Sequence, residues 1–405
     1  MNFMKEIFYH ETLEEFMKKM DEIEYPISVP VSRIIIDYND SLYSKIDELN
    51  IVNRLRGIKQ LGLAGTCSDS AFASGTRYAH SLICSTKIDH IAQTHGLERE
   101  LGVFAGMLHD VGTPPLSDSV AIGLGIKDEE QFVHMLEKCP KLDGLLEEYA
   151  VSKKELIETV TGKNKEPIGQ LMNNPKAIDV DRFSYSNGDA SNLFLLPRVW
   201  RGNYVADPFK SVKIYKGKVV FTDFDSVSQL LESRTQMFER IYKNSHLSAK
   251  EAFLEQVTKN LFEKGLITYE SLFKMVDENF EVLVRRHGGD IGKELFRFDG
   301  FESYGVVDAS EEAVSDFLKQ NTQRPFAVKK HQRIDPAIGT LVMIDGKVDT
   351  YEKWEPGHAH FLEKRMSAWN HTNVYGYEHD KKLAEAVYKA QNRFGIPDIS
   401  FLPED

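Results

Sequence analysis

The spacing of apolar residues predicts helices along most of the chain. Leu97, Leu101 and Leu108 fall at i, i+4 and i+11, so they share one face of a helix that we expect to be buried. Similar spacing predicts further helices over residues 5–23, 47–62, 77–95, 128–137, 141–149, 152–161, 226–243, 247–264, 270–286 and 380–393. A loop is expected over 63–76, where Gly, Ser, Ala and Thr are concentrated.

Alternation of apolar and polar residues predicts strands, most of them late in the chain. Residues 209–221 alternate around Lys216-Gly217, a pair typical of a hairpin turn. Other short strands are expected at 32–37 (strand or buried turn), 304–308, 326–330 and 339–349, the last with a turn at Asp345-Gly346. We therefore predict a mostly α protein, with a helical core and N-terminal extension in residues 1–270 and a smaller α+β C-terminal region in residues 271–405.

Composition narrows the class of protein. The 405 residues include 50 Lys and Arg against 62 Asp and Glu, and the net charge of −12 argues against nucleic acid as a partner. Cys67, Cys84 and Cys139 are far apart, which fits a reducing compartment and argues against a disulfide framework or a cysteine zinc site. There is no apolar signal segment and no run of 18 apolar residues, so we expect a cytoplasmic protein with no membrane partner.

The most informative stretch lies at the end of the helix predicted around Leu108. His109 and Asp110 are adjacent, and Gly112 and Pro114 follow as helix-stopping residues. Alone, such a pair is more often a structural histidine beside a capping aspartate.

Two residues outside this stretch change that interpretation. His80 upstream and Asp181 downstream would complete a set of two imidazoles and two carboxylates. Such a set suits one divalent ion that keeps open positions for water and a substrate oxygen. His358-Ala-His360 could also chelate an ion, but we interpret that stretch as a solvated loop.

The order of these residues resembles that of the HD-domain metal-dependent phosphohydrolases. Further blocks resemble the deoxynucleoside triphosphate triphosphohydrolases, and they follow that family's order over roughly 45–265. The blocks are 53–62, 77–81, 109–117, 178–189 and 233–242. The resemblance implies an HD-domain helical core, a homo-oligomer, and hydrolysis of deoxynucleoside triphosphates to deoxynucleoside and triphosphate.

The resemblance also implies a ligand set for the metal. One divalent ion, which could be Mn, Fe, Ni, Co, Mg or Zn, would be bound by His80, His109, Asp110 and Asp181. Asp181 is chosen over Asp179 because the resemblance makes the second aspartate of this stretch the ligand. Helical spacing agrees, since Asp181 shares a face with residues four and eight positions later, whereas Asp179 does not.

The substrate-binding residues come from the resemblance as well. The nucleotide would be bound by Gln60, Leu61, Arg77, Arg182, Tyr185, Asp189, Arg234 and Tyr242. Gln60 and Leu61 would contact the nucleoside, with Gln60 and Asp189 at the sugar hydroxyl, and the two tyrosines would line sugar and base. The three arginines would hold phosphates, because a guanidinium fork meets two phosphate oxygens at once.

The chain departs from that family at its acid–base histidines. Thr113 stands where the family usually has a histidine, and Glu129 falls near the place of another. Glu129, Glu130 and His134 are candidate replacements as catalytic acid or base, although they could equally be surface charges. Two alternatives therefore stay open: a phosphatase acting on a nucleoside monophosphate or another phosphate ester, and a nucleotide-binding regulatory protein with little catalysis.

Overall fold

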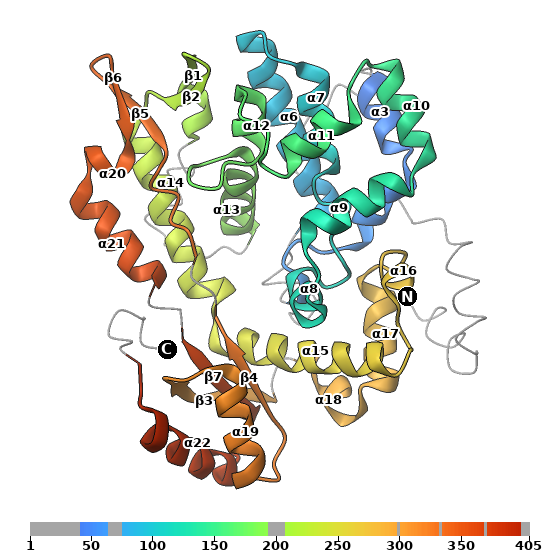
Figure 1. The fold of residues 1–405 in the computed structure, drawn as a ribbon, viewed down its shortest axis with the longest axis vertical. Helices are drawn as coiled ribbons and strands as arrows, with labels where there is room; N and C mark the ends of the chain where they lie inside the picture. The colour runs from blue at the N-terminus through green and yellow to red at the C-terminus, as the bar shows by residue number, and fades with distance from the viewer. Residues whose placement is uncertain are drawn as a thin grey trace.

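The chain folds as a body of packed helices followed by a smaller part with two short sheets (Figure 1). This computed structural model describes residues 41–63, 75–192, 207–297, 300–331, 334–367 and 371–397. The predicted fold class, mostly α with a smaller α+β region, is confirmed. The expected helix at 5–23, the run at 32–37 and residues 64–74 of the expected loop lie outside the described residues. No helix of the described part is long and apolar enough to cross a membrane.

The helical body comprises most of the elements before residue 193. They are α3 (Ser41–Asp47), α4 (Asn50–Asn53), α6 (Arg77–His95), α7 (Arg99–Leu108), α8 (Asp118–Leu124), α9 (Asp128–Glu137), α10 (Pro140–Glu148), α11 (Lys153–Val160), α12 (Pro167–Met172) and α13 (Val180–Asn192). The helices expected at 77–95, 128–137, 141–149 and 152–161 are confirmed within one residue at each end. Their apolar faces meet in one large core that continues into α14 and the first sheet.

Two glycines let the helices approach closely around the predicted motif. A Cβ at Gly106 on α7 would lie 2.5 Å from Cα of Ser85 on α6, so a larger residue would push these helices apart. Gly112 was expected only to stop a helix, but α7 already ends at Leu108. A Cβ at Gly112 would lie 2.7 Å from the backbone nitrogen of Phe132. Because glycine has no Cβ, α9 can pack closely against this turn.

The prediction of one helix over 47–62 is wrong. α3 ends at Asp47, and α4 is followed by a 3₁₀ turn over Arg54–Gly57. The backbone after this turn is bonded to other segments: the carbonyl of Ile58 accepts from the N–H of Arg77 at 2.8 Å, and the N–H of Gln60 donates to Gly75 at 2.8 Å. These tertiary hydrogen bonds replace the helical ones that the apolar spacing predicted.

Two small sheets complete the fold. The first has the order β1-β2-β5-β6 and the second the order β3-β7-β4. Their strands are β1 (Val212–Tyr215), β2 (Lys218–Phe221), β3 (Phe301–Val307), β4 (Phe326–Lys330), β5 (Leu341–Ile344), β6 (Lys347–Thr350) and β7 (Thr372–Tyr377). Both predicted hairpins are confirmed, and each turn has two residues with positive φ: Lys216 (49°) and Gly217 (72°), and Asp345 (49°) and Gly346 (77°).

The remaining helices surround these sheets. They are α14 (Phe224–Met237), a π turn (Phe238–Tyr242), α15 (Ser245–Glu263), α16 (Tyr269–Leu272), α17 (Asp277–His287), α18 (Gly289–Glu294), α19 (Glu311–Asn321), α20 (Tyr351–Trp354), α21 (Pro356–Ser367) and α22 (Lys381–Phe394). In Figure 1, α15 crosses between the helical body and the second sheet, and it packs on α8 and on β3 and β4. The domain boundary at 270 stays a prediction, although the parallel pairing of β2 with β5 joins segments on either side of it.

Two further expectations are wrong. The helix expected over 270–286 is split into α16 and α17, because the carboxylate of Asp277 is bonded to the backbone N–H groups of Lys59 and Leu116, both at 2.8 Å. His358 and His360 lie in helix α21 and not in a loop. His358 contacts the hydroxyl of Tyr351 at 2.6 Å, an interaction that the sequence pattern does not reveal.

Candidate metal centre

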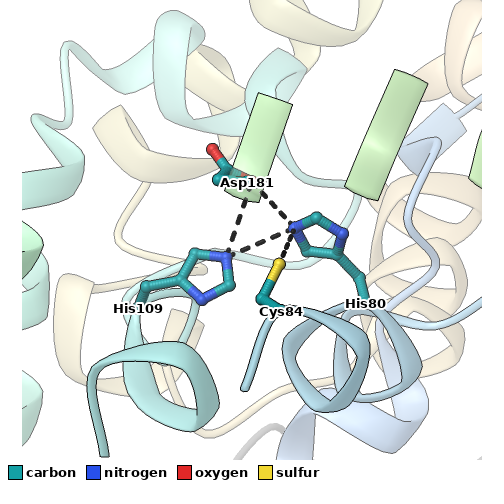
Figure 2. A group of neighbouring side chains, drawn as sticks. All are labelled: His80, Cys84, His109 and Asp181. Atoms are coloured by element: carbon teal, nitrogen blue, oxygen red, sulfur yellow. Dashed lines mark hydrogen bonds and ion pairs between the residues drawn. The ribbon is translucent and has the colours of Figure 1, made fainter. Parts of the chain in front are cut away.

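Three helices bring the predicted metal ligands together. His80 lies on α6, His109 directly follows α7, and Asp181 is in the first turn of α13 (Figure 2). Nε2 of His80 is 2.9 Å from Oδ1 of Asp181 and 3.3 Å from Nε2 of His109. Nε2 of His109 is 3.7 Å from Oδ1 of Asp181. The ring nitrogens and the carboxylate thus face a common point.

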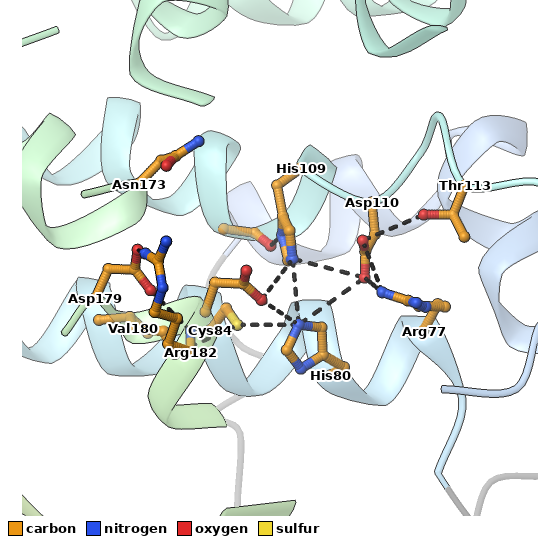
Figure 3. A network of polar contacts seen from close by, with 12 residues as sticks. Arg77, His80, Cys84, His109, Asp110, Thr113, Asn173, Asp179, Val180 and Arg182 are labelled. Atoms are coloured by element: carbon orange, nitrogen blue, oxygen red, sulfur yellow. Dashed lines mark hydrogen bonds and ion pairs between the residues drawn. The ribbon is translucent and has the colours of Figure 1, made fainter. Parts of the chain in front are cut away.

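Asp110 joins the same group from the turn after α7. Its Oδ2 lies 3.6 Å from Nε2 of His109 and 3.9 Å from Nε2 of His80 (Figure 3). Ligands at about 2.0–2.2 Å from one ion are roughly 2.9 Å apart at right angles and roughly 4.2 Å apart when opposite. The contacts that His80 makes with the other three residues fall in this range, so the donor set fits one divalent ion.

Neighbouring groups hold the ligands in the orientation that an ion requires. Nδ1 of His109 lies 2.9 Å from the carbonyl oxygen of Gly106, to which it donates, and this leaves the Nε2 lone pair facing the group. Nη1 of Arg77 donates to both oxygens of Asp110 at 3.2 and 3.3 Å. The hydroxyl of Thr113 donates to Oδ1 of Asp110 at 3.2 Å. These contacts fix one imidazole and one carboxylate before any ion arrives.

The pKa values of the metal ligands are shifted because carboxylates and imidazoles lie close together in a buried site. Burial alone would lower the pKa of His109, but the carboxylates of Asp110 and Asp181 raise it to about 9. Burial would raise the pKa of Asp181, yet hydrogen bonds with His109 and His80 hold it well below its usual range. A divalent cation can supply the positive charge that a proton on His109 otherwise provides.

One side of the group is open. The exposed fraction of the side chain is 4% for His80, 8% for His109 and 11% for Asp110, but 37% for Asp181. A substrate can therefore approach from the side of Asp181, while the other three ligands are covered by protein. This asymmetry is typical of a catalytic metal site, which keeps an open position, and not of a closed structural one.

Three predicted substrate residues lie together beside this opening. Tyr185 follows Asp181 by one turn of α13, and its hydroxyl accepts a hydrogen bond from Nε of Arg234 at 3.0 Å. The ring of Tyr242 meets that of Tyr185 edge to face, with centroids 6.3 Å apart. The guanidinium of Arg234 also lies 5.0 Å from the ring centre of Phe238. We call Tyr185, Arg234 and Tyr242 the aromatic wall.

The two other predicted phosphate-binding arginines contact acidic residues. Arg77 contacts Asp110 and, at 3.5 Å, Asp118. Arg182 pairs with Asp179 and donates to the carbonyl of Asn174 at 2.7 Å. Asp179 in turn accepts from the backbone N–H of Arg182 at 2.8 Å and caps this end of α13. Arg77 thus orients a metal ligand, and Arg182 holds the start of the helix that carries another.

The other predicted substrate residues are Gln60, Leu61 and Asp189, and the structure describes their surroundings only in part. The side-chain oxygen of Gln60 is buried and has no hydrogen-bond partner among the described residues. Leu61 follows it in the turn before Gly62, where φ is 49°. Asp189 lies in α13, and its side chain is outside what the structure describes. A buried acceptor such as the side-chain oxygen of Gln60 needs a hydrogen-bond donor, and a sugar hydroxyl can donate one.

The candidate acid–base residues lie on the outer face of α9. Glu129, Glu130 and His134 are exposed, whereas Phe132 and Leu136 of the same helix are buried. Glu130 pairs with a lysine at 2.8 Å in an exposed salt bridge. In the described part of the chain, no contact joins these three side chains to the metal ligands. Their catalytic role stays a prediction.

Sequence analysis missed one residue of the group, Cys84. Its Sγ lies 3.7 Å from Nε2 of His80, one helical turn away on α6, and it is fully buried. The i, i+4 spacing from His80 was a signal for this contact. The absence of a CxxC motif argued against a cysteine zinc site, and the single sulfur one turn from His80 was therefore not assigned to the metal.

Comparison with known proteins agrees with this geometry. Residues 77–187 match the family model of the HD domain. An uncharacterized protein of Methanocaldococcus jannaschii is 30% identical over 282 residues, which cover 64% of this chain. This chain in turn spans 58% of the length of that relative.

Two solved structures are similar in fold. A hypothetical protein from Aquifex aeolicus gives a TM-score of 0.65 at 18% identity, over 85% of this chain and 95% of the other. A phosphohydrolase from Bacteroides thetaiotaomicron gives a TM-score of 0.67 at 16% identity, over 88% of this chain and 100% of the other. At these identities the likeness establishes the fold alone. The residues that match the HD-domain model, 77–187, include the group of His80, His109, Asp110 and Asp181.

Proposed function

We propose that this protein is a metal-dependent phosphohydrolase that acts on nucleotides and hydrolyses deoxynucleoside triphosphates to deoxynucleoside and triphosphate. The observation that carries the proposal is the convergence of His80, His109, Asp110 and Asp181 inside an HD domain. The fold shared with a protein named a phosphohydrolase supports the reaction class. The ordered sequence blocks that resemble the triphosphohydrolases support the substrate.

The chain's own residues fit a role in binding and orienting such a substrate. When bound, a divalent ion would polarise a phosphoryl oxygen and activate water. Arg77 keeps Asp110 directed at the ion, and burial of three ligands excludes bulk water from all sides except that of Asp181. A phosphate entering beside Asp181 would also meet the aromatic wall.

The aromatic wall offers both stacking and charge. Arg234 uses Nε on Tyr185 and Nη1 on the carbonyl of Asp335 at 2.6 Å in its contacts with described residues. A guanidinium carries five N–H donors, so the oxygens of a phosphate can be bound in addition to these two partners. The ring faces of Tyr185 and Tyr242 suit a sugar or base. This combination favours a nucleotide over a small phosphate ester.

One observation favours a second candidate. Thr113 is occupied with Asp110, and Glu129, Glu130 and His134 lie on the outer face of α9, so the described residues offer no evident proton donor for a leaving group. A general acid typically contributes about 10²–10⁴-fold to the rate. A nucleotide-binding regulatory protein with little catalysis would fit that situation. A phosphatase acting on a nucleoside monophosphate or another ester, the other alternative, would need the same proton at its leaving oxygen.

Product analysis distinguishes these functions. The protein is loaded separately with Mg²⁺, Mn²⁺, Fe²⁺, Co²⁺, Ni²⁺ or Zn²⁺ and incubated with deoxynucleoside and ribonucleoside mono- and triphosphates. Release of deoxynucleoside together with intact triphosphate supports the proposal. Orthophosphate from a monophosphate supports the phosphatase, and tight nucleotide binding without turnover supports the regulatory protein. Absence of both turnover and nucleotide binding with every ion would contradict all three. Asp181→Asn tests the site, with Asp290→Asn on the exposed surface of α18 as the matched control.

A further inference from the structure

A thiol lies among the metal ligands. Figure 2 shows the sulfur of Cys84 directed at the ring of His80, beside His109 and Asp181. The ligand atoms of these four residues all lie within 4.8 Å of one another. Two imidazoles, a carboxylate and a sulfur are thus close enough to bind one ion.

The distances agree with coordination by nitrogen and sulfur. For neighbouring ligands of one ion at angles of about 90–110°, with metal–sulfur and metal–nitrogen bonds of about 2.3 and 2.05 Å, the sulfur and nitrogen lie roughly 3.1–3.5 Å apart and two nitrogens roughly 2.9–3.3 Å apart. Sγ of Cys84 is 3.7 Å from Nε2 of His80, and the two Nε2 atoms of His80 and His109 are 3.3 Å apart. Small movements would complete the set.

The thiol lies near three polar groups, namely the ring of His80, the carbonyl oxygen of Val180 and the hydroxyl of Ser184. Besides the ring of His80, Sγ approaches the carbonyl oxygen of Val180 at 4.0 Å, the limit for a sulfur hydrogen bond. If Cys84 only filled space in the core, its sulfur would not need to lie beside histidine nitrogens. Cys84 instead shares its helix face with His80 and is fully buried, whereas Asp181 is partly exposed.

We propose that the thiolate of Cys84 is an additional ligand of the ion bound by His80, His109, Asp110 and Asp181, and that it makes the site prefer Zn²⁺, Co²⁺ or Fe²⁺ over Mg²⁺ and Mn²⁺. This inference rests on the metal centre of the proposed function. On binding, the S–H bond breaks, the metal–sulfur bond forms and the proton passes to the buffer. Arg77, paired with Asp110, offsets the added negative charge. Soft thiolate ligands select ions in this way because Mg²⁺ and Mn²⁺ prefer oxygen.

Cobalt spectroscopy tests the ligand directly. The metal-free protein is titrated with Co²⁺, and bound cobalt is measured by elemental analysis alongside the near-ultraviolet absorption. A thiolate-to-cobalt charge-transfer band is expected in the wild type and in the controls Cys67→Ser and Cys139→Ser, and it should be absent from Cys84→Ser. Stoichiometric cobalt without this band in the wild type would overturn the inference and leave the metal centre intact. Failure to bind any ion would overturn both.

A second measurement does not depend on the folding of a variant. X-ray absorption of the zinc-loaded wild type should show one sulfur neighbour at about 2.3 Å. A shell of nitrogen and oxygen alone would overturn the inference. If Cys84→Ser folds, its preference for Zn²⁺ over Mn²⁺ should fall by at least about tenfold, since even the loss of a group that only supports a ligand costs that much. An unchanged preference would show that the sulfur does not select the ion.

Discussion

Two buried polar clusters of this protein differ in how their charges are balanced. In the metal centre, two carboxylates and two ring nitrogens face one another. In the second cluster, between α15 and the second sheet, Lys329 pairs with Glu251 at 3.0 Å and with Glu255 at 2.8 Å. Lys329 bridges both carboxylates of the second cluster, whereas Arg77 pairs with Asp110 of the first. Asp181 of the first cluster instead faces two ring nitrogens, an arrangement that a metal ion can complete.

The histidines of the two clusters show the same contrast. Carboxylates raise the pKa of His109 to about 9 against the effect of burial. Burial, Lys243, Lys329 and His371 lower the pKa of His331 to about 2. Nζ of Lys243 lies 3.2 Å from Nδ1 of His331, and Nε2 of the same ring lies 2.9 Å from the hydroxyl of Tyr375. Ring nitrogens that face carboxylates, and not burial alone, distinguish the metal centre from the second cluster.

The largest expected effect is loss of the ion from the metal centre. His109→Ala removes one ligand and leaves the other three without a common geometry, so bound metal should fall from one ion per chain to none. Elemental analysis after dialysis measures this. Lys329→Met serves as the comparison and should retain the ion. Full metal content in His109→Ala would contradict the assignment.

For the free energy of unfolding, we expect the large effect in the second cluster. Lys329→Met leaves two carboxylates buried without their cation, and breaking such a pair costs about 3–5 kcal/mol. Urea unfolding measures the change in the free energy of unfolding. Lys319 pairs with Asp316 on the surface at 3.4 Å, and Lys319→Met should cost less than about 1 kcal/mol. Equal effects of the two substitutions would show that the second cluster is not a stabilising ion pair.

A smaller effect on metal binding is expected from Arg77, which contacts Asp110. Arg77→Gln removes the donors that orient this carboxylate, and metal affinity should fall by about 10–100-fold. Competition with a chelator measures the affinity. Arg99 contacts Asp89 at 2.7 Å in the same helical hairpin, and Arg99→Gln should leave the affinity unchanged. An unaltered affinity in Arg77→Gln would leave Arg77 with a role in phosphate binding only.

The smallest effect concerns pH. His331 stays neutral in the fold but is protonated in the unfolded chain below about pH 6.5, so the unfolded state binds more protons there. The protein should lose up to about 1.4 kcal/mol of stability per pH unit as pH falls below that value. His331→Gln keeps an acceptor for Lys243 and should remove this part of the slope. Parallel pH profiles for the two proteins would refute the lowered pKa.

The sequence predicted the elements that depend on local patterns. Periodicity found the helix that carries His80, and turn chemistry found both hairpins. It failed where distant bonds decide the backbone. The segment after Arg54 leaves the helix because its N–H and carbonyl groups pair with α17 and with the start of α6.

The sequence also predicted part of the candidate site. The ordered motif gave the four clustered metal residues, because their spacing follows from a shared family pattern. Periodicity could not reveal that Arg77 contacts Asp110, since this contact depends on how α6 packs against the end of α7. The contacts of Arg182 with Asp179 and of Cys84 with His80 lie at i,i+3 and i,i+4, a spacing that permits them but does not show that they form. The orientation of Glu129 and Glu130 likewise depends on which face of α9 is buried against the residues around Gly112.

Anomalous diffraction from crystals grown with Zn²⁺ tests the contrast between the two clusters most directly. Data collected at the zinc absorption edge should give one strong peak per chain, within about 2.0–2.3 Å of Nε2 of His80 and Nε2 of His109. No peak should lie near Lys329, Glu251 and Glu255. A map without density at the histidines, or with the ion bound at the lysine–glutamate cluster instead, would contradict the assignment of the metal centre.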